Sequence, residues 1–263
     1  MERQDKDLAF MLQYENVAWY EKGKVRILDR RIYPSRVEFV VCENHHEVTK
    51  AITDMVTQSA GPYTAAAMGM ALAAWECRDM SADLRREYLK TAADEIAHAR
   101  PTTVNRMLLI VSACLNVAEA ALQAGEDVSQ AIVNHTVESN NLRYEKIGRM
   151  ARYLVDMFPQ NGRILTQCFG ETIVGQMLKE ARRRGNDLKI FCAETRPYFQ
   201  GARLTASVAK DMGFDVTVIT DNMPAFAIQH EKIDVFTSAA DVVCQDGYIV
   251  NKVGTFQIAI VAK

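Results

Sequence analysis

The second half of the chain carries four short apolar runs that alternate with longer segments of helical composition. The runs are RILTQC (163–168), LKIFCAE (188–194), FDVTVIT (214–220) and KIDVFTSA (232–239). Strands that are buried on both faces of a parallel sheet read as continuous apolar runs, and parallel neighbours need a crossover connection between them. The alternation therefore predicts repeated βαβ units and a Rossmann-like parallel sheet.

The first half has a different pattern. Two short β runs, VAWY and KVRILD, flank Glu21-Lys22-Gly23, which predicts a hairpin. From about His45 to Phe158 apolar residues recur at helical spacing. Breaks in this pattern lie at Gly61-Pro62, residues 79–82, Arg100-Pro101 and Gly125. We expect an α/β protein with a hairpin and helical domain over residues 1–130 and a Rossmann-like catalytic domain over residues 131–263.

Composition excludes several classes of protein. The 263 residues are 49% hydrophobic and 24% charged, with a formal net charge of -2, which is typical of a globular chain. The mixed charges give no electrostatic footprint for nucleic acid or for an anionic membrane. We expect no apolar run of membrane-spanning length and, from the charged start MERQDKDLAF, no secretory signal. A cytoplasmic location without nucleic-acid or membrane partners is therefore predicted.

Motifs for cofactors are missing from the sequence. The six cysteines form no CxxC pair, so reduced thiols are expected. The residues after the first apolar run, CFGETIVG, lack the GxGxxG spacing, and no GxxxxGK[ST] occurs. The five histidines show no metal-ligand spacing along the chain. We expect neither a cofactor nor a metal.

Ligands of such parallel sheets bind at the carboxyl ends of the strands, so residues directly after each run are candidates. Cys168 ends the first run and precedes a predicted helix start, where a thiol can have a lowered pKa and act as a base. The alternative is a small buried core residue. Asp241 follows the fourth run, and its alternative is a loop or capping carboxylate.

Two further polar stretches are candidates for binding. Residues 194–205 follow the second run, and Gln200 in this stretch could hydrogen-bond sugar hydroxyls, while its arginines could bind anions. Asn251 and Lys252 stand before a predicted helix start, where an amide, a cation and backbone N–H groups could meet a phosphate. A surface Asn-Lys pair and a loop-positioning ion pair are the alternatives.

Several stretches together resemble one family. ILTQC, ETRPYFQGARLTA, ITDN, AADVV and NKVGT occur in the order and approximate spacing of the methylthioribose-1-phosphate isomerases, and ARPTTVN resembles their ARPT-type segment. These isomerases belong to the family that also contains the regulatory subunits of initiation factor 2B. The resemblance runs from the hairpin to the last residue.

The resemblance implies an aldose–ketose isomerase that acts, without a cofactor, on a phosphorylated pentose and forms a homodimer. It places Cys168 and Asp241 on the catalytic positions. It assigns substrate binding to Gln58, Ser59, Ala60, Arg100, Gln200, Asn251 and Lys252. In the implied reaction the Cys168 thiolate removes the C2 proton and Asp241, held protonated by an apolar pocket, serves ring opening or reprotonation; hydride transfer stays an alternative.

The sequence departs from the family pattern in three places. Gln58-Ser59-Ala60 stands where the isomerases carry an Arg-Gly-Ala loop, and Val242 stands where arginine often follows the aspartate. The family continues through at least one further βα unit after residue 263, so we expect a C-terminally short sheet. Two alternatives remain: a ribose-1,5-bisphosphate isomerase, or a non-catalytic sugar-phosphate- or nucleotide-binding regulatory protein, although the non-catalytic subunits characteristically lack the cysteine.

Overall fold

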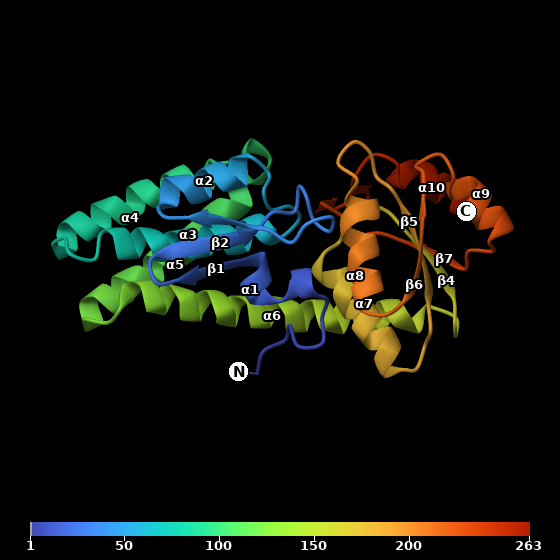
Figure 1. Ribbon diagram of the computed structural model, residues 1–263, viewed down its shortest axis with the longest axis horizontal. Coiled ribbons are helices and arrows are strands. Elements are labelled where there is room, and N and C mark those ends of the chain that lie inside the picture. The colour runs from blue at the N-terminus through green and yellow to red at the C-terminus, as the bar shows by residue number, and fades with distance from the viewer. Residues whose placement is uncertain (1) are drawn as a thin grey trace. The chain divides into compact units, whose positions relative to one another are not determined.

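The computed structural model describes residues 2–263, which form two compact units (Figure 1). One unit is built on Gln13–Arg143, and the other on Gln4–Leu12 together with Tyr144–Lys263. The division falls inside helix α6 (Val128–Asp156), whereas the sequence placed it at residue 130. No glycine or proline interrupts residues 128–147, so the helix that starts in the first unit runs on into the second.

The first unit combines a small sheet with helices. Its elements are α1 (Tyr14–Val17), β1 (Ala18–Glu21), β2 (Lys24–Leu28), β3 (Phe39–Cys42), α2 (His45–Thr53), α3 (Gly61–Glu76), α4 (Ala82–Ala97), η2 (Pro101–Thr103) and α5 (Val104–Ala124), followed by the first part of α6. The strands pair antiparallel in the order β1-β2-β3, with Trp19 opposite Arg26 and Arg26 opposite Val41. The predicted hairpin is confirmed, and β3 extends it.

Helix α3 is the centre of the first unit. It is rich in alanine, and nearly all of its side chains are buried against β1, β2, α2, α4 and α5. Small side chains let these elements approach closely: a Cβ on Gly69 would lie only 2.9 Å from Val48 Cγ1 of α2. A helix that is apolar on all sides is typical of such a central position.

Helix α5 corrects one expectation. Together with η2 it forms the 24-residue segment Pro101–Ala124, which contains an 18-residue window with a mean hydropathy of 1.7 and so meets the length and composition of a membrane span. The expectation that no apolar run approaches this length is therefore wrong. Its buried residues recur at steps of three or four and pack in the core of the unit; they are Met107, Val111, Cys114, Ala118 and Ala121. A core helix with one packed face meets the same length criterion.

The second unit contains the parallel sheet. Its elements are η1 (Phe10–Leu12), the end of α6, β4 (Arg163–Thr166), α7 (Thr172–Arg183), β5 (Lys189–Ala193), the π-helical turn η3 (Gly201–Thr205), α8 (Ala206–Asp211), β6 (Asp215–Ile219), α9 (Pro224–His230), β7 (Val235–Thr237), the hairpin strands β8 (Val242–Val243) and β9 (Ile249–Val250), and α10 (Thr255–Ala262). The strand order is β6-β5-β4-β7, all parallel. The predicted α/β fold with a Rossmann-like sheet is confirmed.

The helices of this unit cover both faces of the sheet. Figure 1 shows α7 and α8 on one side of the strands and α9 on the other, where α10 packs against it. Right-handed crossovers require this arrangement, because the chain moves from β4 to β6 in one direction and then returns past β4 to β7. The reversal creates a topological switch point between β4 and β7.

The segment Gln4–Leu12 completes the second unit from the opposite end of the sequence. Tyr144 Oη donates to the Leu12 carbonyl at 2.9 Å, the Phe10 N–H donates to Asp211 at 2.6 Å, and Lys179 Nζ donates to the Lys6 carbonyl at 2.6 Å. Met11 and Leu12 are fully buried. This short segment is therefore part of the core that supports α7 and α8.

Glu180 on α7 gives a testable dependence of stability on pH. Its buried carboxylate accepts hydrogen bonds from Arg183 at 2.7 and 2.8 Å and from Arg184 at 2.6 Å. The Arg183 hydrogen bonds, against the effect of burial, lower the pKa of Glu180 to about 2. A carboxylate whose folded pKa lies below its unfolded pKa stabilises the protein above about pH 4–5, and this contribution is lost as the pH falls through about 2.

We therefore expect Glu180→Gln to lower the free energy of unfolding at pH 7 by about 1–2 kcal/mol, a value reduced from the full linkage because the arginines are partly exposed. The difference from wild type should shrink as the pH falls from 5 to about 2. Urea unfolding at several pH values measures the difference in unfolding free energy and its dependence on pH. Asp215→Asn, which removes an exposed pair with Lys189 in the same unit, is the control and should change little. A difference that stays constant with pH would contradict the assignment.

Candidate active site at the strand ends

The two candidate catalytic residues follow the two strands at the switch point. Cys168 lies two residues after the end of β4, and Asp241 lies four residues after the end of β7, the neighbour of β4 in the sheet. Thr166 and Thr237 are register partners, so β4 and β7 end at the same edge of the sheet. This is the position at which open parallel sheets bind their ligands.

The backbone of Cys168 is fixed in an unusual conformation. Its φ is 62°, in the left-handed region that non-glycine residues rarely adopt. Its N–H donates to Thr195 Oγ1 at 3.1 Å, and its carbonyl accepts a hydrogen bond from the Thr205 hydroxyl. The Thr195 hydroxyl in turn donates to the Ala193 carbonyl at 3.0 Å. Strained backbone held by surrounding contacts is a feature of active sites.

The environment of the Cys168 thiol differs from the sequence-based expectation. Burial raises the pKa of Cys168, and the Asp241 carboxylate adds to the increase. The Phe169 N–H and the Lys252 ammonium group favour the thiolate but do not outweigh burial. The prediction of a lowered pKa is therefore wrong, because the sequence shows the helix start but not the burial. The resting side chain is a neutral thiol at pH 7.

These interactions place Cys168, Asp241 and Lys252 in one electrostatic neighbourhood of the second unit. Asp241 is exposed, so the expectation that an apolar pocket surrounds it is also wrong. Its N–H donates to the Val250 carbonyl at 2.8 Å, which ties it to the β8–β9 hairpin. The hairpin thus fixes the backbone of Asp241 while its side chain stays accessible.

The loop after β5 brings Gln200 to the same edge of the sheet. Asp221, after β6, accepts hydrogen bonds from the N–H groups of Thr195 at 2.8 Å and Arg196 at 2.7 Å. Gln200 then precedes the π-helical turn η3, a feature that is frequent at functional sites. The Gln200 side chain is buried, and its Oε1 has no hydrogen-bond partner among the described residues. A buried polar atom without a partner is costly unless a ligand or water satisfies it.

Asn251 and Lys252 lie between β9 and α10. Asn251 Nδ2 donates to Ser238 Oγ, after β7, at 3.2 Å, and the Lys252 ammonium group lies 5.8 Å from the centre of the Tyr198 ring. Gln167 Nε2 donates to the Val253 carbonyl at 2.8 Å, while its buried Oε1 has no partner among the described residues. The end of β4 is thereby joined to the loop that carries Lys252.

The remaining candidates lie in the first unit. Gln58 is buried before α3, and its Oε1 has no partner among the described residues, whereas Ser59 is exposed and Ala60 is half-buried. Arg30 is fully buried, and its Nη1 donates to the Gln58 carbonyl at 2.7 Å. Arg100 is half-buried and directly precedes η2.

Two residues that support these candidates were not singled out from the sequence: Arg30 and Gln167. Thr195 and Asp221 lie in the stretches after the second and third runs, where the strand-end rule predicts ligand-binding residues, and Gln167 directly follows β4, so the same rule could have found it. Arg30 had no such signal, because its contact with Gln58 spans 28 residues.

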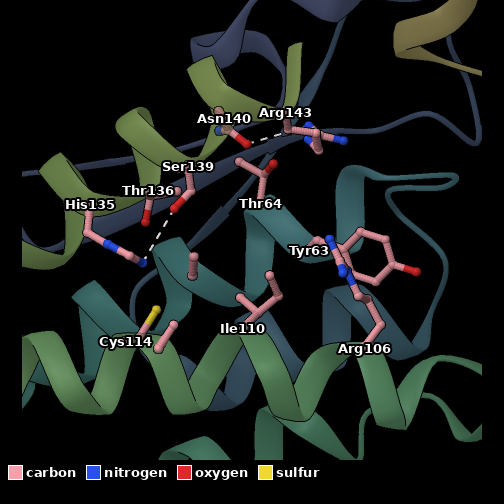
Figure 2. A pocket seen from close by; sticks show the side chains of 12 residues that line it. Tyr63, Thr64, Arg106, Ile110, Cys114, His135, Thr136, Ser139, Asn140 and Arg143 are labelled. Carbon is pink, nitrogen blue, oxygen red and sulfur yellow. Dashed lines mark hydrogen bonds between the residues drawn. The ribbon is translucent and has the colours of Figure 1, made fainter. Parts of the chain in front are cut away.

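A separate pocket of about 130 Å³ lies inside the first unit, between α3, α5 and α6 (Figure 2). Figure 2 shows Arg106, beside the ring of Tyr63, and Arg143 at one end, with His135 and Ser139 at the other. No carboxylate lines the pocket in the described chain, so its chemistry favours anions over cations. None of the predicted site residues lines it, and we assign it no part in the chemistry at the strand ends.

Comparison with known proteins identifies relatives over most of the chain. The model of the initiation factor 2 subunit family matches residues 57–263. The methylthioribose-1-phosphate isomerase of Carboxydothermus hydrogenoformans is 32% identical over 93% of this chain and 73% of its own length. That of Geobacillus kaustophilus is 33% identical over 94% and 71%. The chain thus spans about three quarters of the length of these relatives.

Solved structures agree with the sequence matches. The 5-methylthioribose 1-phosphate isomerase of Pyrococcus horikoshii is 25% identical with a TM-score of 0.81, covering 96% of this chain and 74% of its own. The delta subunit of translation initiation factor eIF-2B from A. fulgidus is 28% identical with a TM-score of 0.80, covering 94% and 74%. These similarities confirm the relationship and the fold class that the sequence predicted. The chain belongs to the initiation factor 2 subunit family.

Proposed function

We propose that this protein is an aldose–ketose isomerase that converts 5-methylthioribose 1-phosphate, or a 5-deoxy pentose 1-phosphate, into the corresponding ribulose 1-phosphate. The observation that carries the proposal is the grouping of Cys168, Asp241 and Lys252 at the switch point of the sheet. A thiol, a carboxylate and a cation there supply two groups for proton transfer and one for a phosphate. Relatives named as methylthioribose-1-phosphate isomerases support this assignment.

The proposed reaction moves one hydrogen from C2 to C1 and one proton from the C2 hydroxyl to the ring oxygen, and it needs no redox partner because substrate and product are isomers. The ring opens while the phosphate stays on C1, a base removes the proton from C2, and a proton is returned to C1. Cys168 is the proposed base in its thiolate form, and Asp241 is the proposed group for ring opening and reprotonation. Lys252, Asn251 and Gln200 are proposed to hold the phosphate and hydroxyl groups, which would satisfy the unpaired oxygen of Gln200.

Gln58, Ser59, Ala60 and Arg100 are proposed to bind substrate from the first unit. Gln58 stands where the family pattern has arginine, which removes one cation from this loop. Arg30 offsets the loss, because its guanidinium contacts the Gln58 carbonyl and lies at 3.1 Å from the position of a Cβ on Gly61. The positive charge of Arg30 is therefore next to the loop at Gln58, although the loop itself is neutral.

The position of Arg30 predicts the effect of Gln58→Arg. The new guanidinium would enter a nearly buried position beside the buried Arg30. Two like charges without water are unfavourable, so we expect the free energy of unfolding to fall by about 2–3 kcal/mol and the KM to rise. In the double variant Arg30→Gln/Gln58→Arg, which keeps one cation, at least about 1 kcal/mol should be recovered. Higher stability together with a lower KM in the single variant would show that Arg30 does not replace the missing charge.

A substrate panel tests the proposed function. The full chain is incubated with methylthioribose, deoxyribose and ribose 1-phosphates and with ribose 1,5-bisphosphate, and ketose formation is followed by NMR. We expect the highest kcat/KM for methylthioribose 1-phosphate. A preference for ribose 1,5-bisphosphate would reassign the substrate. Thermal stabilisation by a sugar phosphate or nucleotide without turnover would support a regulatory role, which the similarity to the initiation factor subunit makes the second candidate.

We also propose that the protein acts in the cytoplasm as a homodimer that pairs through the second unit. All six cysteines are free thiols, as expected in a reducing compartment. On the hairpin, the loop after it and α10, the side chains of Val243, Val253 and Phe256 are 74%, 90% and 79% exposed, which is apolar area that a second copy could cover. Light scattering at micromolar concentration tests this assembly, and a monomer would contradict it.

A further inference from the structure

Three side chains that are distant in the sequence converge on the surface of the first unit. His45 and His46 begin α2, and Glu95 lies in the last turn of α4. His45 Nε2 lies 3.7 Å from Glu95 Oε2, and His46 Nδ1 lies 2.8 Å from the same oxygen. One ligand atom from each residue falls within 4.8 Å of the others. The two imidazole rings lie 4.0 Å apart between centroids.

The spacing suits donors around one metal ion. Nitrogen and oxygen ligands lie about 2.0–2.2 Å from zinc, so two ligands of a tetrahedral ion are about 3.3 Å apart. The His45–Glu95 distance of 3.7 Å is close to this value and is beyond hydrogen-bonding range. The His46–Glu95 contact has to lengthen by some tenths of an ångström, which is feasible because His46 is 64% exposed and Glu95 is 35% exposed.

His45 is oriented by a carboxylate, as metal-binding histidines usually are. His45 is 2% exposed, and its Nδ1 lies 2.6 Å from Glu76 Oε2. Glu76 also accepts a hydrogen bond from the His45 N–H and another from Tyr88 Oη, both at 2.6 Å. A carboxylate that accepts from Nδ1–H fixes the tautomer that leaves Nε2 as a lone-pair donor, and it raises the basicity of that nitrogen. In His45 this nitrogen faces Glu95.

We propose that His45 Nε2, His46 Nδ1 and a carboxylate oxygen of Glu95 bind one divalent transition-metal ion, with zinc as the best match. Two imidazoles and one carboxylate form a donor set that zinc accepts, and a water molecule completes the fourth position. Glu76 is a positioning residue that acts through His45, with Tyr88 behind it. The ion would join the start of α2 to the end of α4, so its role is to tie these helices together. Residue spacing along the chain does not indicate this site, because Glu95 follows His46 by 49 residues.

Binding of Co²⁺ and Zn²⁺ to the untagged, chelator-treated full chain tests this site. We expect one Co²⁺ per chain with the visible d–d absorption of a four- or five-coordinate N/O site, displacement of Co²⁺ by Zn²⁺, and a rise in Tm with added Zn²⁺. His46→Ala and Glu95→Gln should each raise the Kd by at least about a hundredfold and abolish the absorption band. Both residues are partly exposed, so these variants should fold.

Two further variants separate a built site from adventitious binding. His98→Ala removes an exposed histidine paired with Asp94 at 3.3 Å near the end of the same helix, and it should bind Co²⁺ as wild type does. Glu76→Gln should raise the Kd by about 10–100-fold while the shape of the absorption band is kept, because the ligands stay in place. Wild-type affinity in His46→Ala, or equal loss in His98→Ala, would overturn the proposal. So would the lack of stoichiometric binding in wild type. None of these outcomes depends on isomerase turnover.

Discussion

Replacing Cys168 by serine should lower kcat by at least about a hundredfold, because a general base typically contributes that much and a hydroxyl is a far weaker acid than a thiol. The fold should not change. Serine fits the same volume, and both backbone hydrogen bonds that fix residue 168 use main-chain atoms. Steady-state kinetics on methylthioribose 1-phosphate and a thermal melt measure the two effects. Near-normal turnover in a folded variant would remove Cys168 from the chemistry.

The raised pKa of Cys168 adds a pH dependence to this prediction. A base that rests as a neutral thiol becomes active as the pH rises, so kcat/KM should increase with pH towards a limb above the ordinary thiol pKa of about 8.5. Lys252→Gln removes a charge that favours the thiolate and should move the limb to higher pH, whereas Asp241→Asn should move it to lower pH. The rate of alkylation against pH, measured in a Cys244→Ser background because Cys244 is the other partly exposed thiol, reports the same pKa without turnover. A kcat/KM that falls with rising pH would instead make Cys168 an acid.

Gly201→Ala should disrupt the second unit. A Cβ on Gly201 would lie 1.8 Å from the Ala193 carbonyl oxygen and 2.9 Å from Thr195 Oγ1. The carbonyl belongs to the backbone of β5, which pairs with strands on both sides, so it cannot move away without breaking the sheet. We expect the free energy of unfolding to fall by at least about 3 kcal/mol, or the unit not to fold at all.

Gly148→Ala is the matched control. Gly148 lies on α6 in the same unit, and an added Cβ would meet only the end of the flexible Gln176 side chain, at 3.3 Å. Alanine also favours a helix interior over glycine by about 0.5–1 kcal/mol, so this variant should be as stable as wild type or more stable. Chemical unfolding of both variants compares them. Equal stability of Gly201→Ala and wild type would show that the π-helical turn can shift to accommodate a side chain.

The parallel sheet was predictable because strands buried on both faces leave uninterrupted apolar runs, such as those that became β4 and β5. Helix starts and ends followed from Pro62, Pro101 and Gly125, whose backbone preferences act locally. The strand β3 and the division inside α6 were not predictable in this way. Both depend on which distant segments pack together, and α6 carries no local signal at the boundary.

The candidate site shows the same division between local and distant information. Cys168 and Asp241 could be chosen from the sequence because they follow strands, and the resemblance to a known family added their roles, which the experiments above test. The surroundings of these two residues could not be predicted from the sequence. The burial of the thiol, the exposure of Asp241 and the contact of Arg30 with the Gln58 loop all arise from residues far apart in the chain. The convergence of His46 and Glu95 has the same origin.

The placement of Gln4–Leu12 has a consequence for how the protein forms during synthesis. This segment is made long before its partners: the contacts of Lys6 with Lys179 and of Phe10 with Asp211 span 173 and 201 residues. At about 5–20 residues per second, the ribosome needs roughly 10–40 s to add that length. Until α6 and α7 are made, the side chains of Leu8, Met11 and Leu12, which end up buried, lack the residues of the second unit that contact this segment. The segment Gln4–Leu12 is therefore accessible to chaperones and to other nascent chains while the first unit is synthesised.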